Sequence, residues 1–277
     1  MSLSIREHKF FWGKRPYLLG ILNITPDSFS DGGQFNELQA AIAQAEYMID
    51  NGADIIDIGG QSTRPGAEKI SVQEEFNRVI PVIKAIRQQF SIPISVDTTR
   101  ATIAQDAIAA GADLINDISG GTFDPEMFSV AANLDVPIIL MHMRGTPQTM
   151  QQMTDYQDLV ADIIDFLSHQ IQNAIACGVR ESKIIIDPGI GFAKTPEQNI
   201  ELLRRLSEFK ALKVPILVGT SRKSFIGKII NQPEPQKRVW GTAATCCSAI
   251  MSGADILRVH DVAEIYDVSR VTDTISR

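Results

Sequence analysis

This sequence of 277 residues has few cysteines, no net positive charge and no long apolar run. Its three cysteines, Cys177 and the adjacent Cys246 and Cys247, match neither a disulfide framework nor a metal site, which favours a reducing, cytoplasmic compartment. The formal net charge of −7 argues against a protein that binds nucleic acid or a membrane surface, because both need a basic face. No apolar run reaches the ~18 residues of a membrane span, and residues 1–16 lack the apolar core of a signal peptide.

The sequence also lacks linkers, low-complexity segments and a Gly-x-Gly-x-x-Gly turn after its first apolar segment. We therefore predict one domain spanning residues 1–277. Within it, Gly-Ala-Asp recurs at 52–54, 111–113 and 253–255, each time before an apolar stretch. A glycine in that place ends a helix and leads into a strand. Proline opens three further apolar stretches, at residues 93, 137 and 215.

Apolar strands, eight in all, alternate with amphipathic helices in this pattern. Helical periodicity covers residues 37–50, 72–89, 155–176 and 196–206, among others. The isoleucines at 184–186 indicate a strand buried on both faces, as in a parallel sheet covered by helices. We predict an α/β fold, a (β/α)8 TIM barrel, with a short N-terminal β-hairpin before Tyr17 that closes the barrel floor. An open doubly wound sheet is the alternative.

Polar residues gather where the predicted strands end, which is the face on which such barrels carry their active sites. They are Asn23, Asp57, Asp97, Asn116, Asp117, His142, Asp187, Arg258 and His260, and Gly219 ends the one predicted strand without a polar side chain. The polar groups at 97, 116 and 187 suit a flat, nitrogen-rich heterocycle, since a carboxylate accepts two parallel N–H donors. A cationic set suits a phosphate or diphosphate, and it consists of Arg64, Lys223, Arg258 and His260.

Several of these residues also have a purely structural interpretation. Asp97 could cap a helix that starts at residues 98–100, and Asp187 could cap the turn that follows it. Asn116 could be a strand-end amide bonded to backbone, and His260 a satisfied polar side chain. The role of His142, which also follows a strand, stays open.

Four motifs resemble the signatures of the dihydropteroate synthase family. They are Ile-Leu-Asn-Ile-Thr-Pro-Asp-Ser-Phe-Ser-Asp-Gly-Gly at 21–33, Asp-Ile-Gly-Gly-Gln-Ser-Thr-Arg-Pro-Gly-Ala at 57–67, Asp-Pro-Gly-Ile-Gly-Phe at 187–192 and Gly-Thr-Ser-Arg-Lys-Ser-Phe-Ile-Gly at 219–227. The resemblance covers nearly the whole chain from Tyr17 onward and runs through Arg258-Val-His260. Gln61 departs from the family pattern, in which many members carry Glu.

The resemblance implies a transferase of folate biosynthesis. It would join 6-hydroxymethyl-7,8-dihydropterin diphosphate to p-aminobenzoate, releasing pyrophosphate and forming 7,8-dihydropteroate. The resemblance also implies Mg²⁺ as the cofactor and a homodimer as the assembly. Catalysis then consists of charge stabilisation and positioning, so no nucleophile is assigned. Loops 25–36 and 59–69 are expected to close over the diphosphate and exclude water. Sensitivity to sulfonamide analogues of p-aminobenzoate stays open.

By the same resemblance, the site residues divide among three ligands. The pterin is assigned to Asp97, Asn116, Met141, Asp187, Phe192, Gly219 and Lys223. The diphosphate is assigned to Asn23, Thr63, Arg258 and His260, with Asn23 also binding Mg²⁺. p-Aminobenzoate is assigned to Phe29, Thr63, Arg64, Pro65, Phe192 and Ser224, although Ser224 could also be an ordinary helix residue. Lys223, Arg258 and His260 are expected to act in the reaction itself.

Three other functions compete with this interpretation. A pterin-binding methyltransferase serving a corrinoid partner would share the Asp and Asn residues, but it needs neither the cationic set nor the Thr-Arg-Pro-Gly loop. A non-catalytic pterin-binding module would not need Lys223, Arg258 and His260 intact. A Schiff-base aldolase would use Lys223, whose pKa the neighbouring Arg222 could lower. The intact motifs disfavour all three.

Overall fold

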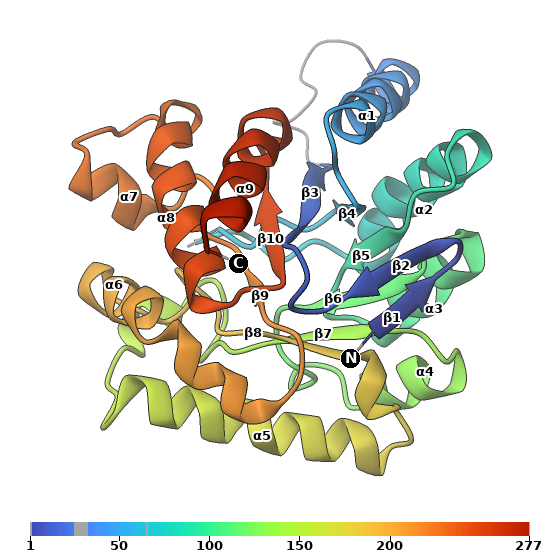
Figure 1. Cartoon of the computed structure of the whole chain (residues 1–277). Coiled ribbons are helices and arrows are strands. Elements are labelled where there is room, and N and C mark those ends of the chain that lie inside the picture. Colours follow the sequence, from blue (N-terminus) through green and yellow to red (C-terminus); the bar gives the residue numbers. More distant parts are fainter. Residues whose placement is uncertain (1, 25–32, 65, 277) are drawn as a thin grey trace.

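The computed structural model describes residues 2–24, 33–64 and 66–276 of the chain (Figure 1). Two residues assigned to p-aminobenzoate from the sequence, Phe29 and Pro65, lie outside this description.

A parallel sheet of eight strands curls into a nearly closed barrel. Its strands are β3 (Tyr17–Asn23), β4 (Ile55–Gly59), β5 (Ile94–Asp97), β6 (Leu114–Asp117), β7 (Ile138–Met141), β8 (Ile184–Asp187), β9 (Leu217–Val218) and β10 (Ile256–Val259). Neighbours run in the order β8-β7-β6-β5-β4-β3-β10-β9, and a parallel bridge from Ile186 to Ile216 joins the two ends. The predicted barrel is confirmed, and the open sheet is excluded.

Helices surround the strands (Figure 1). They are α1 (Gly33–Asp50), α2 (Val72–Gln89), α3 (Ala101–Ala110), α4 (Met127–Asn133), α5 (Leu159–Ala176), α6 (Pro196–Arg204), α7 (Ser224–Ile229), α8 (Val239–Ser252) and α9 (Val262–Ser276). Short 3₁₀ helices lie at Met150–Gln152, Glu181–Lys183, Leu206–Leu212 and Pro235–Arg238. In the described ranges, no helix is both long and apolar enough to cross a bilayer.

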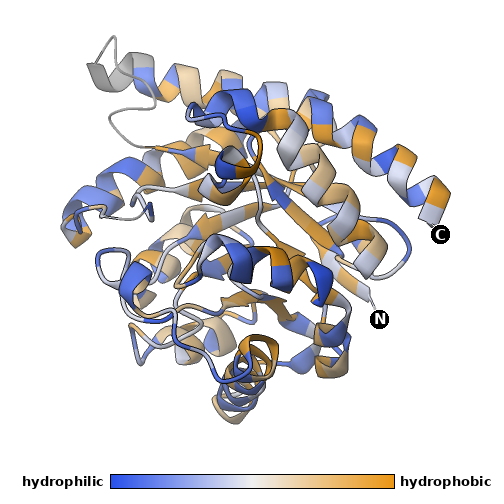
Figure 2. Ribbon diagram, turned by 90° about the vertical axis from the view of Figure 1, so that its left-hand side faces the viewer, coloured by the Kyte–Doolittle hydropathy of each residue, from blue (hydrophilic) through white to orange (hydrophobic). Residues whose placement is uncertain are grey.

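In Figure 2 the strands at the centre are mostly coloured hydrophobic, whereas hydrophilic residues lie mainly on the surrounding helices and loops. Strand residues alternate between two cores, as the three consecutive isoleucines show. Ile184 and Ile186 pack into the core between strands and helices. Ile185 points the other way, into the lower barrel interior. Burial on both faces, predicted from this run, is therefore present.

An antiparallel hairpin closes the amino-terminal end of the barrel. It consists of β1 (Ser2–Ile5) and β2 (His8–Phe11), which precede the first barrel strand. Its buried residues Leu3, Ile5 and Phe10 belong to one cluster with the inward-facing residues of the barrel strands, namely Leu19, Ile55, Leu114, Ile139, Ile185, Leu217 and Ile256. The predicted floor is confirmed, and it leaves the opposite rim open for a site.

Candidate active site

Arg258 joins three strands at the carboxyl-end rim. From β10, its Nε donates to Asp57 Oδ2 at 2.7 Å, and its Nη2 donates to Asp97 Oδ2 at 2.6 Å. Burial disfavours the charged guanidinium, but Asp57 and Asp97 outweigh that effect and raise the pKa of Arg258. Burial also raises the pKa of Asp97, against the opposing influence of Arg258. The two carboxylates therefore hold a cation at the centre of the rim.

Asp57 is a site residue to which the sequence analysis gave no role. It is completely buried on β4, and its Oδ2 also accepts from Asn116 Nδ2 at 3.1 Å. Within the described residues its Oδ1 has no hydrogen-bond partner. The available signal was a lone carboxylate inside Ile-Ile-Asp-Ile, because a buried charge needs partners. Asp57 therefore holds the side chains of Asn116 and Arg258 next to each other.

The structural interpretations of Asp97 and Asn116 are wrong. Helix α3 begins at Ala101 with Arg100 at its N-cap, and the Ala101 amide donates to Asp124 Oδ2 at 2.8 Å. The carboxylate of Asp97 is instead bound to Arg258. Asn116 donates to a carboxylate rather than to backbone.

Asp187 lies across the rim from Asp97, at the end of β8. Its Oδ1 accepts from the Gly189 amide at 2.7 Å, so the expected turn cap is present. A Cβ on Gly219 would lie 4.0 Å from Asp187 Oδ2 and 3.7 Å from Arg258 Cβ. The absence of a side chain at Gly219 therefore keeps space open between these two groups. Burial raises the pKa of Asp187, and Lys223 and Arg258 oppose this shift.

Lys223 and two apolar residues form a wall beside Asp187. Its Nζ lies 4.3 Å from the centre of the Phe192 ring, a cation–π contact. Phe192 and Met141 share a buried apolar cluster with Ile118. Burial and Arg258 lower the pKa of Lys223 to about 8, although Asp187 raises it. The wall thus offers flat apolar contact with one ammonium donor.

His260 does not belong to the cationic set, which corrects the sequence analysis. Burial, then the nearby Arg222 and Arg258, lower its pKa to about 3, so the imidazole is neutral at neutral pH. The His260 amide donates to Ser221 Oγ at 3.1 Å, and Nδ1 lies 2.9 Å from the same oxygen. This hydroxyl can therefore donate to Nδ1, which favours the tautomer with its proton on Nε2. His260 enters the site as a neutral N–H donor.

The remaining predicted residues lie around this centre. Arg64 is exposed, yet it is close enough to His260 to lower the pKa of that histidine. Asn23 is half-buried at the end of β3, in register with Gly59 of β4. Ser224 is exposed at the first position of α7, and no hydrogen bond of its side chain to another described residue is present. Asn23 and Arg64 therefore lie near the other residues of the rim, whereas Ser224 lies at the start of α7 without a side-chain hydrogen bond to the described residues of the rim.

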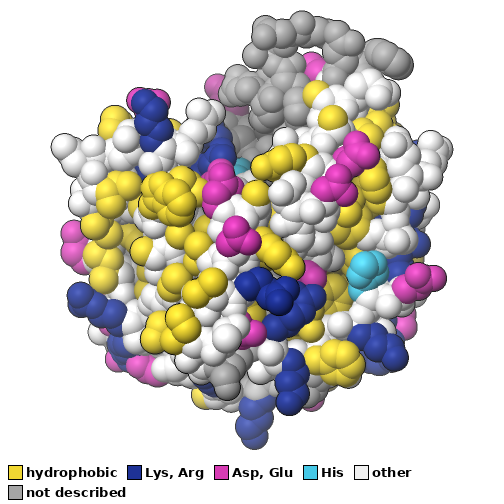
Figure 3. Space-filling view, turned by 45° about the horizontal axis from the view of Figure 1, so that its top comes forward, with side chains coloured by type: hydrophobic (Ala, Val, Ile, Leu, Met, Phe, Trp, Pro, Cys, Tyr) yellow, Lys and Arg dark blue, Asp and Glu magenta, His cyan; other side chains and the backbone are white. Residues whose placement is uncertain are grey.

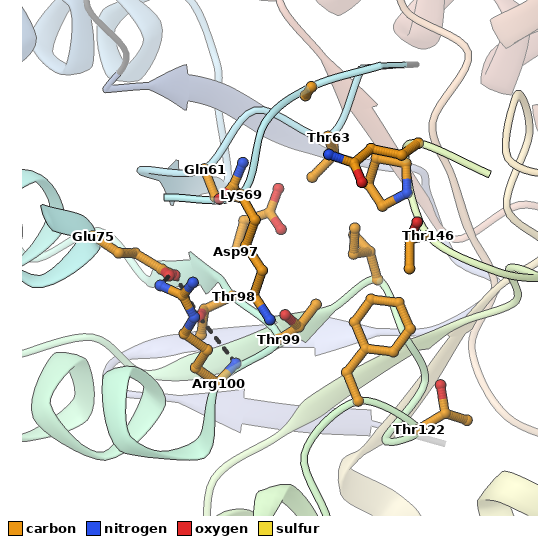
Figure 4. A pocket seen from close by; sticks show the side chains of 15 residues that line it. Gln61, Thr63, Lys69, Glu75, Asp97, Thr98, Thr99, Arg100, Thr122 and Thr146 are labelled. Carbon is orange, nitrogen blue, oxygen red and sulfur yellow. Dashed lines mark hydrogen bonds and ion pairs between the residues drawn. The ribbon is translucent and has the colours of Figure 1, made fainter. Parts of the chain in front are cut away.

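Thr63 lines a cavity of about 410 Å³ that reaches Asp97. In Figure 4, Asp97 lies near the middle of this cavity, with Thr63 and Thr146 on one side. The ion pair between Arg100 and Glu75, at 2.6 Å, forms the opposite side. The cavity therefore opens beside Asp97, the heterocycle-binding residue predicted at the end of β5.

The loop that carries Thr63 and Arg64 is held by the side chain of Gln61. Its Nε2 donates to the carbonyls of Ser62 and Glu68, both at 2.9 Å, and its Oε1 accepts from the Ile70 amide at 2.9 Å. A second tie joins the Gly66 amide to the Pro147 carbonyl at 3.0 Å. Most of the other loop expected to close, residues 25–32, lies outside the described residues.

Comparison with known proteins shows a family match over most of the chain. Residues 19–260 match the family described as pterin binding enzyme. A dihydropteroate synthase of a Synechocystis strain is 60% identical over 275 residues, which are 99% of this chain and 95% of that protein.

Solved structures agree with this match. A dihydropteroate synthase from Clostridium difficile, determined in the presence of pteroic acid, is 50% identical with a TM-score of 0.92, covering 97% of this chain and 99% of that one. A dihydropteroate synthase from Xanthomonas albilineans, with 4-aminobenzoic acid, is 42% identical with a TM-score of 0.89, covering 94% of this chain and 93% of that one.

Proposed function

The chain belongs to the pterin-binding enzyme family as a dihydropteroate synthase, and on that premise we propose how its rim residues divide the reaction. The enzyme condenses 6-hydroxymethyl-7,8-dihydropterin diphosphate with p-aminobenzoate, giving pyrophosphate and 7,8-dihydropteroate. One observation supports the division of roles more than any other. Arg258 lies between the carboxylates of Asp97 and Asp57 while also neighbouring Gly219 and Asp187. Acceptors for a pterin and a cation for its leaving group therefore share one rim.

The pterin edge binds to Asp97, Asn116 and Asp187. An amino-pyrimidinone presents neighbouring N–H donors, and buried carboxylates accept such pairs strongly. Lys223 donates to the ring oxygen and N5 of the pterin. Phe192 and the neighbouring Met141 contact the ring face, because they form the apolar wall of the site. Gly219 leaves room for the ring beside Asp187.

The diphosphate binds to Arg258, His260, Asn23 and Thr63. The bond between the pterin methylene and the diphosphate oxygen breaks, and its electron pair leaves with the oxygen. Arg258 and the Nε2–H of His260 stabilise that developing charge, the kind of electrostatic assistance that usually dominates catalysis. The arylamine nitrogen then attacks the methylene carbon and afterwards releases a proton to water. No side chain forms a covalent bond in this sequence.

The described residues fit a magnesium ion that is held mainly by the diphosphate. Mg²⁺ keeps several waters and uses few protein ligands in addition to substrate phosphate. Asn23 offers one amide oxygen at the end of β3. Across the described ranges, no group of three His, Cys, Asp or Glu side chains could cage an ion. When bound, Mg²⁺ would neutralise charge on the departing pyrophosphate.

p-Aminobenzoate binds next to the pterin methylene. Thr63 and Arg64 frame it from the loop after β4, and Phe192 packs against its ring. We place its carboxylate near Ser224, where the first amides of α7 lack helical partners. Phe29 and Pro65 complete this set on the basis of the family resemblance alone.

We also propose a homodimer, one domain over residues 1–277, and a cytoplasmic compartment. Large apolar side chains are exposed on two helices that pack together, α8 and α9. They are Trp240, Met251, Val271 and Ile275. Apolar side chains also gather on the left of the surface in Figure 3, the side on which α7 and α8 lie in Figure 1. A second copy of the chain would cover them. The three cysteines are free thiols, which fits a reducing compartment.

Pyrophosphate release tests this function directly. We expect release to require the pterin diphosphate, p-aminobenzoate and Mg²⁺ together, and to form dihydropteroate in equal amount. Binding of the pterin without turnover would indicate a non-catalytic module. Methyl transfer from a folate to a corrinoid would indicate the methyltransferase. Trapping of a substrate on Lys223 by borohydride would indicate the aldolase.

A further inference from the structure

Lys194 is a buried lysine to which the proposed reaction gives no role. Its side chain is 2% exposed, three residues after Gly191 in the loop that follows β8. Its Nζ donates to the Phe192 carbonyl at 2.8 Å and lies 3.0 Å from His142 Nδ1. In the described part of the chain, no carboxylate oxygen lies within 4.0 Å of this nitrogen. Burying an ammonium without an ion-pair partner is costly, so its retention calls for a physical reason.

His142 acts as the acceptor for this lysine. It is buried, and its ring packs edge-on against Phe166 with centroids 5.0 Å apart. Burial, then Lys194 and Arg144, lower its pKa to about 2, so the imidazole is neutral. A neutral imidazole whose Nδ1 faces an ammonium accepts from it. His142 therefore receives a hydrogen bond from Lys194 and supports the loop after β8.

The same contacts fold the loop after β8 onto the end of β7. The His142 amide donates to the Asp187 carbonyl at 3.0 Å. Gly189 has φ +74°, and a Cβ there would lie 2.0 Å from the His142 carbonyl oxygen and 3.4 Å from Lys194 Nζ. Lys194 therefore fills the space inside the turn between Asp187 and Phe192. Those two residues are the ones that hold the pterin edge and face in the proposed site.

We propose that Lys194 is a positioning residue for the pterin site, which shapes the loop from Asp187 to Phe192 and places a positive charge inside the turn that Asp187 caps. This inference rests on the proposed roles of Asp187 and Phe192. The shaping role is carried by the bonds to the Phe192 carbonyl and to His142. The electrostatic role follows from the position of the ammonium. Lys194 Nζ would lie 3.4 Å from a Cβ on Gly189, whose amide donates to Asp187 Oδ1 at 2.7 Å.

The protonation state of Lys194 affects the pKa of Asp187, and that of Asp187 affects the pKa of Lys194. Burial raises the pKa of Asp187, while Lys223, Arg258 and Lys194 lower it. Burial lowers the pKa of Lys194 to about 7, Asp187 raises it, and Lys223 and Arg144 lower it further. Lys194 is therefore charged below about pH 7 and neutral above. Its support for the Asp187 carboxylate is strongest in acid, where that carboxylate is most at risk of protonation.

Two substitutions separate the two roles. Lys194→Gln keeps N–H donors for the carbonyl and the imidazole but removes the charge, whereas Lys194→Met removes both. Binding of 6-hydroxymethylpterin, which lacks the diphosphate and cannot turn over, is measured by calorimetry at about pH 6 and about pH 8.5. Lys84→Met, on the exposed face of α2, is the matched control. Thermal unfolding checks that each variant is folded.

We expect Lys194→Gln to bind like the parent at the higher pH and more weakly at the lower pH, by up to about tenfold, which is the largest effect that an upward shift of one unit in the pKa of Asp187 can have. Lys194→Met should bind more weakly at both. If Lys194→Met does not fold, the Gln variant alone decides. An equal loss at both pH values, or no loss, in Lys194→Gln would overturn the proposal. Failure of the parent to bind pterin would instead overturn the proposed function.

Discussion

At the residue scale, the site depends on charges shared between distant segments. Arg258 is 201 residues from Asp57 and 161 residues from Asp97 in sequence, yet it donates to both. In the proposed reaction, Asp97 binds the pterin while Arg258 binds the diphosphate. Asp57 must then hold Arg258 in place, because Asp97 is no longer free to do so. This sharing makes Asp57 a positioning residue for the reaction.

Asp57→Asn tests this role. The variant leaves Arg258 with Asp97 as its carboxylate partner, so the arginine competes with the pterin for that residue. We expect kcat/KM for the pterin diphosphate to fall by at least about 30-fold, since breaking a buried charge pair typically costs 2–5 kcal/mol. The KM for p-aminobenzoate should change little. Steady-state kinetics measure both, with Asp106→Asn on the exposed face of α3 as control. Unchanged kinetics in Asp57→Asn would show that Asp57 does not position Arg258 for the reaction.

We predict that Lys223 sets the alkaline limit of activity. In the proposed site its ammonium form donates to the pterin, and burial lowers its pKa to about 8. The donor is therefore present below that pH and is lost as the pH rises through it. We expect kcat/KM for the pterin diphosphate to decline above about pH 8, where an unperturbed lysine would hold to about pH 10. In Lys223→Arg, the activity that remains should lack this decline. A flat profile to about pH 10 in the parent would contradict the assignment.

Much of the site could be predicted residue by residue, but not all of it. Asp97, Asn116, Asp187 and Arg258 end predicted strands, so topology alone places them on one rim. The proposed role of Lys194 could not be predicted, because it depends on a contact with His142, 52 residues away. The neutral state of His260 was also hidden, since it depends on burial and on neighbouring cations.

At the element scale, the loop after β4 is shaped by one amide side chain. Gln61 donates to two carbonyls and accepts from one amide, and a carboxylate could make only the last of these bonds. Thr63 and Arg64, which the proposed function gives to p-aminobenzoate, lie inside this loop.

Gln61→Glu should therefore loosen the second-substrate site. We expect the KM for p-aminobenzoate to rise by about 3- to 10-fold, equivalent to losing roughly one net hydrogen bond. The KM for the pterin diphosphate should rise less than the KM for p-aminobenzoate, because Thr63 is the one residue of this loop that the proposed function gives to the diphosphate and its other proposed residues lie on other elements. Gln73→Glu, at the exposed start of α2, controls for added charge. An equal rise for both substrates would show that the loop serves the whole site.

Element boundaries were predicted less well than element order. The helix expected over residues 155–176 begins at Leu159, because Asp158 caps it by accepting from the amides of Val160 and Ala161. The helix expected over 196–206 ends at Arg204, and a 3₁₀ segment follows. Periodicity locates a helix, whereas side-chain caps decide where it starts.

At the scale of the whole molecule, the fold was the most predictable feature. Repeated Gly-Ala-Asp segments and apolar strands imply alternating helices and strands, and closure buries every strand on both sides. The oligomeric state could not be predicted from the residue pattern, because it depends on which apolar side chains remain exposed after folding. Trp240, at 73% exposed, shows this clearly.

A dimer through α8 and α9 predicts a specific defect. The double variant Trp240→Glu, Met251→Glu places two charges where a second copy would pack, and we expect it to sediment as a monomer at micromolar concentration. Tyr47→Glu, at a comparably exposed position on α1, should leave the parent assembly unchanged. Analytical ultracentrifugation distinguishes these outcomes. A parent protein that is monomeric at high concentration would contradict the proposed homodimer.

The proposed function requires strand ends from separate parts of the barrel to form one acceptor site for a pterin. Calorimetric binding of 6-hydroxymethylpterin to the parent and to Asp187→Asn tests it most directly. The substitution turns an acceptor into a group that also donates toward the N–H edge of the ligand. We predict a clear binding signal for the parent and a loss of affinity of at least about tenfold in Asp187→Asn, as for a buried charged hydrogen bond. Parent-like affinity in a folded Asp187→Asn would contradict the account.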